Sequence, residues 1–127
     1  MRNEARVSVF KGKTFKLTKA IFWILAYKQP LTIYEVYKQV RKWRELKHVK
    51  YSVVNVRMRT LEKRGYIERK GKKKTKAGFE AFLYQLTYRA YLAMILNKLN
   101  VDDFIENAGE ESLISALASF ISWTVNR

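Results

Sequence analysis

The nine residues Leu61–Arg69, LEKRGYIER, decide the fold because they join a predicted helix to a predicted strand without a loop. Gly65 follows an amphipathic stretch, and glycine often ends a helix because it adopts left-handed backbone angles without strain. The next residues, Tyr66-Ile67-Glu68-Arg69, favour a strand, since aromatic and β-branched side chains pack well in sheets. We therefore expect a helix that ends at Gly65 and a hairpin that begins directly after it.

Three helices are expected up to Gly65, each with a polar residue that can cap its start. The clearest start signal is the capping box of Thr32 and Glu35, in which each side chain bonds to the other residue's backbone NH. The predicted helices and their caps are residues 17–28 with Thr18, residues 33–43 with Thr32 and residues 53–64 with Ser52.

A basic hairpin is expected after the third helix, over residues 66–76, with its turn at Lys70-Gly71-Lys72-Lys73. Apolar residues from Phe79 to Leu96 then recur at helical spacing, which predicts a long helix over residues 76–97. A short helix to Ala108 and a final helix over residues 111–125 complete the chain. Residues 1–16 have two interpretations, a short strand or a basic arm.

Composition limits the chemistry of this chain of 127 residues, which has the length of one domain. It has no cysteine and one histidine, His48, which excludes disulfides and Cys-containing zinc sites. The longest uncharged stretch, Ser112–Asn126, has 15 residues, whereas a membrane-spanning helix needs about 20. We expect a cytoplasmic protein without a cofactor and without a membrane partner.

Charge is distributed unevenly along the chain. Residues 1–78 hold 23 basic and 5 acidic residues, a net charge of +18, whereas residues 79–127 hold 3 basic and 6 acidic residues, a net charge of −3. Positive charge confined to one part of a protein indicates a surface for a polyanion. Nucleic acid is the first candidate and an anionic membrane surface the second.

Three helices followed by a basic hairpin are the arrangement of a winged helix-turn-helix. The residues Leu61–Arg69 and Thr75-Lys76-Ala77-Gly78-Phe79-Glu80 resemble the recognition-helix exit and the post-wing segment of MarR-like and PadR-like transcriptional regulators. The resemblance covers about residues 17–99, and the lysine-rich composition resembles small versions from archaea or archaeal mobile elements. It implies a mainly α fold with a small β-hairpin wing (α+β) and C-terminal dimerisation helices.

The third helix has the faces that a recognition helix needs. At about 100° per residue, Val54, Met58 and Leu61 share one face and should pack inward. The opposite face suits the major groove, where Arg binds guanine, Asn binds adenine and an apolar side chain contacts a thymine methyl group. A merely solvated face is the alternative, and the capped helix before it and the hairpin after it favour DNA. The predicted base contacts are Ser52, Asn55, Val56 and Arg59.

Phosphate contacts are expected from the hairpin and from two other helices. Lysine is a weaker reader of bases than arginine, so we assign these side chains to the DNA backbone or the minor groove. The alternative, a solubilising turn, does not explain so dense a cluster. The predicted backbone contacts are Lys63, Arg69, Lys70, Lys72, Lys73, Lys74, Lys16 and Lys19.

Enzyme sites are not supported by the sequence. Gly12-Lys13-Thr14 resembles the end of a phosphate-binding loop, but position 7 is valine where that loop needs glycine. The acidic residues near Asp102 fit the first turn of a helix, where they complement its dipole. His48 lies among lysines and has no nucleophile partner in the pattern. We therefore predict no enzyme activity.

The predicted function is sequence-specific binding of double-stranded DNA as a transcription regulator, a repressor, that reads the major groove with residues 53–64. The alternatives are an architectural or replication-associated DNA-binding protein of low specificity and a winged-helix docking module of the transcription machinery. The expected parts are residues 1–16 as the N-terminal segment, residues 17–78 as the winged helix-turn-helix and residues 79–127 as dimerisation helices.

A homodimer is expected because the C-terminal helices carry more apolar surface than a small core can cover. The alternative is that the last helix folds back and completes a monomeric core. The predicted interface residues are Phe82, Leu86, Leu113, Leu117, Phe120 and Ile121.

Overall fold

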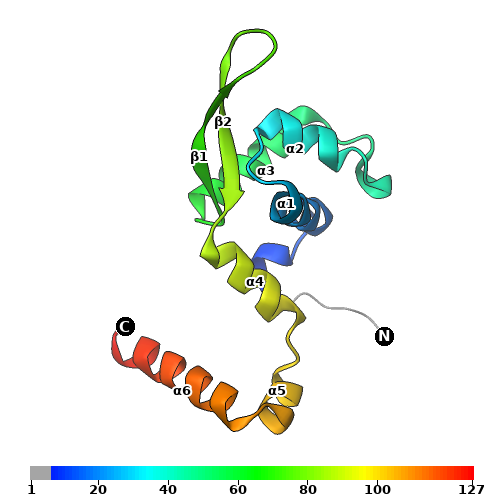
Figure 1. Ribbon diagram of the computed structural model, residues 1–127. Helices are drawn as coiled ribbons and strands as arrows, with labels where there is room; N and C mark the ends of the chain where they lie inside the picture. Colours follow the sequence, from blue (N-terminus) through cyan, green and yellow to red (C-terminus); the bar gives the residue numbers. More distant parts are fainter. Residues whose placement is uncertain (1–6) are drawn as a thin grey trace. The chain divides into compact units, whose positions relative to one another are not determined.

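The computed structural model describes residues 7–127, and the chain divides into two compact units (Figure 1). The first unit ends at Asn97 and the second is Lys98–Arg127. In chain order, the elements are η1 Ser8–Phe10, α1 Phe15–Lys28, α2 Ile33–Val40, η2 Arg44–Leu46, α3 Tyr51–Lys63, β1 Ile67–Lys74, β2 Glu80–Leu86, α4 Tyr88–Lys98, α5 Val101–Asn107 and α6 Glu110–Val125.

The core of the first unit lies between the three helices α1, α2 and α3 and the base of the hairpin. The inward faces that the apolar spacing predicts are confirmed, because Val54, Met58 and Leu61 of α3 are completely buried. They pack with Leu25 of α1 and Val36 of α2 in one hydrophobic cluster. This cluster fixes the orientation of α3 and therefore of its outward face.

The helix starts agree only in part with the predicted caps. The capping box is confirmed, since the backbone NH of Glu35 donates to Thr32 Oγ1 at 3.1 Å and that of Thr32 donates to Glu35 Oε1 at 2.9 Å. Thr18 and Ser52 are not caps, because α1 and α3 begin three residues and one residue before them. Thr18 is instead buried inside α1, and its hydroxyl has no hydrogen-bond partner among the described residues.

The segment before α1 contains a 3-10 turn, η1, and residues 7–14 form no strand, so the first of the two interpretations of residues 1–16 is wrong over this range. Val9 and Phe10 are buried in the core, and the Phe10 ring meets that of Phe22 edge to face at 5.0 Å. Burial of both apolar residues explains the compact turn, since a strand would point alternate residues away from the core. The first six residues of the predicted basic arm lie outside the described part of the chain.

The hairpin, which we call the wing, consists of β1 and β2 paired antiparallel from Ile67 opposite Leu86 to Lys74 opposite Glu80. A bulge at Lys70 interrupts the register, and Gly71 beside it has a φ of 128°, which glycine tolerates. Leu31 adds a bridge to β2, with backbone hydrogen bonds to Tyr84 of 3.0 and 2.8 Å. The wing is therefore anchored to the segment between α1 and α2.

The predicted long helix over residues 76–97 is wrong in its first half. Residues 80–86 form β2, the helix α4 begins only at Tyr88, and the wing therefore extends well beyond the predicted residues 66–76. Apolar residues at Phe82, Tyr84 and Leu86 also fit the two-residue period of a strand, and pairing with β1 decides between the two periods. The predicted basic turn at residues 70–73 lies within β1, while the actual turn joins Thr75 to Phe79.

The second unit contains α5 and α6. Asn100 caps α5 by accepting a hydrogen bond from the backbone NH of Asp103 at 3.0 Å. No residue of either helix is buried within the chain, and apolar side chains run along α6. Between residues 7 and 127, no helix is long and apolar enough to cross a membrane.

Candidate nucleic-acid interface

The outward face of α3 carries the four residues predicted to contact bases. Ser52, Val56 and Arg59 are exposed, and Asn55 lies half-buried at the edge of this face. Val56 is 64% exposed on this face, on the side of the helix opposite to its buried residues. A small apolar side chain presented between polar ones matches the chemistry of base edges in the major groove.

One flank of α3 faces the wing, and we call it the wing-side flank. Its residue Glu62 accepts a hydrogen bond from Arg69 Nε at 2.9 Å, which makes an ion pair between α3 and β1. The guanidinium of Arg69 also lies 4.0 Å from the centre of the Phe82 ring. Arg69, predicted as a phosphate contact, is therefore already held by two neighbours within the protein.

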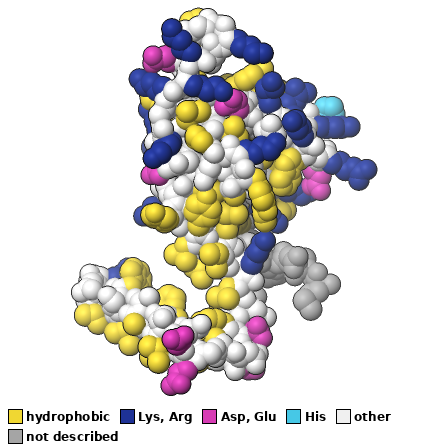
Figure 2. Space-filling model, in the orientation of Figure 1, with side chains coloured by type: hydrophobic (Ala, Val, Ile, Leu, Met, Phe, Trp, Pro, Cys, Tyr) yellow, Lys and Arg dark blue, Asp and Glu magenta, His cyan; other side chains and the backbone are white. Residues whose placement is uncertain are grey.

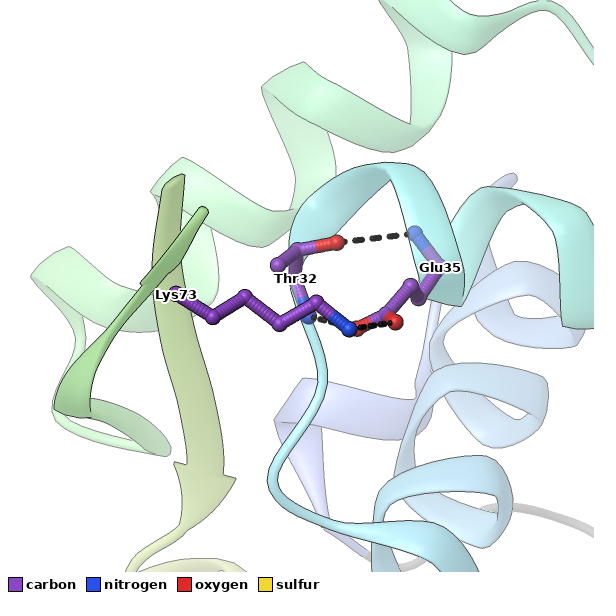
Figure 3. Close-up of polar contacts among 3 residues, drawn as sticks. All are labelled: Thr32, Glu35 and Lys73. Atoms are coloured by element: carbon purple, nitrogen blue, oxygen red, sulfur yellow. Dashed lines mark hydrogen bonds and ion pairs between the residues drawn. The ribbon is translucent and has the colours of Figure 1, made fainter. Parts of the chain in front are cut away.

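A second ion pair fixes the wing against α2 (Figure 3). Lys73 Nζ lies 2.5 Å from Glu35 Oε2, while the other oxygen of the same carboxylate accepts the Thr32 backbone NH. Burial raises the pKa of Glu35, but hydrogen bonds from Lys73 and from the Thr32 backbone outweigh burial and leave this pKa below its ordinary value. Lys73 thus links the wing to the capping box of α2.

The other lysines of the wing differ in how they are held. Lys72 pairs with Glu80 across the hairpin at 3.6 Å and lies 5.2 Å from the Phe82 ring centre. The side chains of Lys70 and Lys74 make no ion pair with any residue in the described range. Lys76 lies exposed in the turn of the wing, and the sequence reasoning missed it because that residue fell in the predicted helix.

A basic surface continues onto α1 and the linker between α2 and α3. Figure 2 shows Lys and Arg side chains gathered over the wing, α2 and this linker, with His48 among them. Lys16 makes an ion pair with Glu45 of the linker, and Lys19 is exposed one turn further along α1. A shallow groove lies here, lined by Phe15, Lys16, Lys19, Lys42, Trp43, Arg44, Glu45 and Leu46.

The residues predicted for the dimer interface fall into two groups. Leu86 is buried in the core of the first unit, whereas Phe82 lies under Arg69 and is 37% exposed. Their assignment to the interface followed from the predicted helix, which is a strand at this point. The four residues of α6 remain exposed, at 36% to 65%: Leu113, Leu117, Phe120 and Ile121.

The acidic residues near Asp102 and the single histidine, His48, are the alternative candidates for an enzyme site, and they lie in a helix and in the linker between α2 and α3. Asp102 and Asp103 occupy the first turn of α5, where Asp103 also accepts a hydrogen bond from Asn107 Nδ2 at 2.8 Å. His48 is exposed in the linker. In the part of the chain that the structure describes, no group of three His, Asp or Glu side chains could hold a metal ion.

Comparison with solved structures identifies the fold. A PadR-like transcriptional regulator from Bacillus cereus superposes with a TM-score of 0.53 at 14% identity, over 87% of this chain and 96% of that one. This chain has the winged-helix fold of the PadR-like regulators. PadR of Bacillus subtilis, solved in complex with operator DNA, has a TM-score of 0.51 at 23% identity, over 86% of this chain and 60% of that one. The sequence matches no protein-family model and no curated protein.

Proposed function

We propose that the protein binds double-stranded DNA and regulates transcription as a repressor, with α3 in the major groove. The observation that carries this proposal is the outward face of α3, which exposes Ser52, Val56 and Arg59 beside a lysine-rich wing. A B-DNA major groove about 12 Å wide admits one helix. The PadR structure with operator DNA, which has the same fold, supports the same type of partner.

Each residue of this face has a distinct role in the proposed complex. Arg59 donates two hydrogen bonds to the O6 and N7 atoms of guanine, and Asn55 pairs with adenine. Val56 contacts a thymine methyl group, and Ser52 bonds to a base edge at the start of the helix. Lys63, on the same face at the end of α3, contacts phosphate.

The wing supplies contacts to the DNA backbone. Lys70 and Lys74, without ion-pair partners in residues 7–127, are available for phosphates, as is Lys76 in the turn. Arg69, Lys72 and Lys73 exchange their carboxylate partners for phosphates on binding or hold the wing in place. Lys16 and Lys19 extend the backbone contacts onto α1.

A homodimer completes the proposed function. The exposed apolar residues of α6 form a stripe, with serines on the opposite side, and α4 exposes Tyr88, Leu92 and Ile95. Residues 98–127 hold five acidic and two basic residues, so two copies of this unit approach with little repulsion. A dimer presents two recognition helices about 34 Å apart, which is one turn of duplex.

Selection of bound duplexes from a random pool, followed by gel-shift competition, tests this proposal. A palindromic consensus that outcompetes random duplex at equal salt is the expected result. Equal competition by random duplex would favour the architectural alternative. No binding to any duplex would favour a protein-docking module and contradict the proposal.

A further inference from the structure

The flank of α3 opposite the wing, which we call the far flank, carries a second pair of cations. Arg57 and Arg64 are seven residues apart and therefore lie on the same side of the helix. Glu62, which contacts the wing, is on the other flank. Arg57 instead points toward the start of α1, where its guanidinium donates a hydrogen bond to Thr14 Oγ1.

Arg57 is half-buried without a counter-ion. Its hydrogen-bond partner is a neutral hydroxyl, and no carboxylate among the described residues pairs with it. Burial lowers the pKa of Arg57, and the positive charge of Arg64 lowers it further. A half-buried cation normally lies beside a carboxylate, because removal from water is costly unless an opposite charge compensates.

Arg64 is similarly surrounded by neutral and positive groups. Its Nη2 lies 3.5 Å from Ser8 Oγ, and its guanidinium lies 5.4 Å from the centre of the Tyr66 ring. A third guanidinium, that of Arg89, donates to the Arg64 carbonyl oxygen at 2.8 Å. Arg64 and Arg89 therefore meet at the end of α3, with Arg57 two turns earlier, and none of the three pairs with an acidic residue of the described chain.

We infer that Arg57 and Arg64 form a phosphate-binding site on the far flank of α3, whose occupant is a backbone phosphate of bound duplex DNA. This inference rests on the proposed function for the source of the phosphate. The planar guanidinium matches two phosphate oxygens, and the hydroxyls of Ser8 and Thr14 can donate to others.

The position of the site relative to α3 favours DNA as the source. A helix in the major groove has a phosphate backbone on each side. The wing lies on one flank of α3, and Arg57 and Arg64 lie on the other. In the proposed complex, one backbone strand meets the wing, and the other strand passes on the side of Arg64 and Arg57. A free phosphate ion or a phosphorylated small molecule would satisfy the same chemistry without duplex, and the experiment separates these sources.

The first part of the experiment measures duplex binding against salt concentration for Arg57→Gln, Arg64→Gln and the double variant. Each lost phosphate contact should lower the magnitude of the salt slope by about 0.9. For the double variant, the loss of affinity between roughly 50 and 200 mM salt should therefore be about tenfold smaller. Arg127→Gln, the same charge change on the second unit, is the matched control and should keep the wild-type slope.

One further variant, Arg57→Lys, and the single variant Arg64→Gln distinguish a phosphate contact from a purely structural effect. Arg57→Lys keeps the charge but not the two-pronged geometry, so it should keep the salt slope and lose affinity. Arg64→Gln changes an exposed side chain and should keep the wild-type unfolding temperature, which keeps the test valid even if Arg57→Gln does not fold.

The second part measures the unfolding temperature in inorganic phosphate and in chloride at equal ionic strength. Wild type should gain stability in phosphate, and the glutamine variants should lose this gain. If the glutamine variants lose the stabilisation by phosphate but keep the wild-type salt slope for duplex binding, DNA is not the source of the phosphate and the site binds free phosphate. Wild-type values in both measurements for all variants would overturn the site itself. If wild type binds no duplex, the proposed function fails, while the phosphate measurement still decides whether the site exists.

Discussion

Arg57 and Arg59 show how position on one helix separates two roles for the same side chain. They are two residues apart, so their side chains point about 200° apart around the helix axis. Arg59 is exposed on the outward face, whereas Arg57 is half-buried against the start of α1. The helical period predicted the outward face and therefore Arg59, but the hydroxyl that contacts Arg57 belongs to a residue 43 positions earlier in the chain. No local pattern could identify that partner.

At this scale we predict that Arg59→Ala costs about 1–3 kcal/mol of affinity for the selected site and relaxes the preference at one base position. The reason is the loss of two hydrogen bonds to guanine, while contacts to phosphate remain. Competition with duplexes that vary at each position measures both effects. Unchanged specific binding would show that the outward face of α3 is not the base-contacting face.

Glu35 gives a prediction for stability against pH. Because its pKa is lowered in the folded protein, its contribution to stability is present above the pKa of the unfolded chain, near 4.5. That contribution is lost as the pH falls through the lower folded value. At pH 7, the Glu35→Gln variant should therefore have a lower urea midpoint of unfolding than wild type. The difference between the two midpoints should become smaller as the pH falls. Urea midpoints at several pH values test this prediction. Glu68→Gln is the control, because it leaves Lys73 and the cap of α2 unchanged. A difference between the Glu35→Gln and wild-type midpoints that does not depend on pH would contradict the contribution of the ion pair.

At the scale of elements, the sequence predicted α1, α2, α3 and a hairpin in the right order. It failed where two periods compete, since the residues from Phe79 to Leu86 suit a helix as well as a strand. Long-range contacts decide the outcome, namely the register with β1 and the bridge between Tyr84 and Leu31. The same error placed the buried Leu86 in the predicted dimer interface and left Lys76 out of the predicted phosphate contacts. The cap at Ser52 failed because the linker keeps extended backbone only to Lys50.

The wing as an element should act through charge and not through sequence. Replacing Lys70, Lys74 and Lys76 together with glutamine should weaken binding to all duplexes alike, with a salt slope smaller by about 0.9 for each lost contact. Gel shifts over a range of salt concentrations with specific and random duplexes measure this. Lys28→Gln, which removes one positive charge outside the wing at the end of α1, is the control for the effect of a single charge. A loss confined to the selected sequence would instead assign base contacts to the wing.

At the scale of the molecule, charge and apolar surface are segregated. Residues 1–78 carry a net charge of +18, and residues 79–127 carry −3. Exposed apolar side chains occur along the whole chain, and α6 has a continuous stripe of them. A large exposed apolar patch is unusual for a monomer, and α6 lies outside the part of the sequence whose charge would keep two copies apart. This segregation is what the proposed function requires, a basic surface for DNA and a separate apolar surface for a second copy of the chain.

The last prediction concerns this second surface. Along α6, Leu113, Leu117 and Phe120 share one side, while Ser115 and Ser122 lie on the other. Light scattering at micromolar concentration should give twice the chain mass of 15.1 kDa. Leu117→Asp combined with Phe120→Asp should give the single-chain mass, because a buried carboxylate on each copy opposes association. The matched variant, Ser115→Asp combined with Ser122→Asp, should remain a dimer. A wild-type mass near that of one chain would contradict the dimer. A single chain would bind one half-site only, so the selected DNA site should then also lack palindromic symmetry.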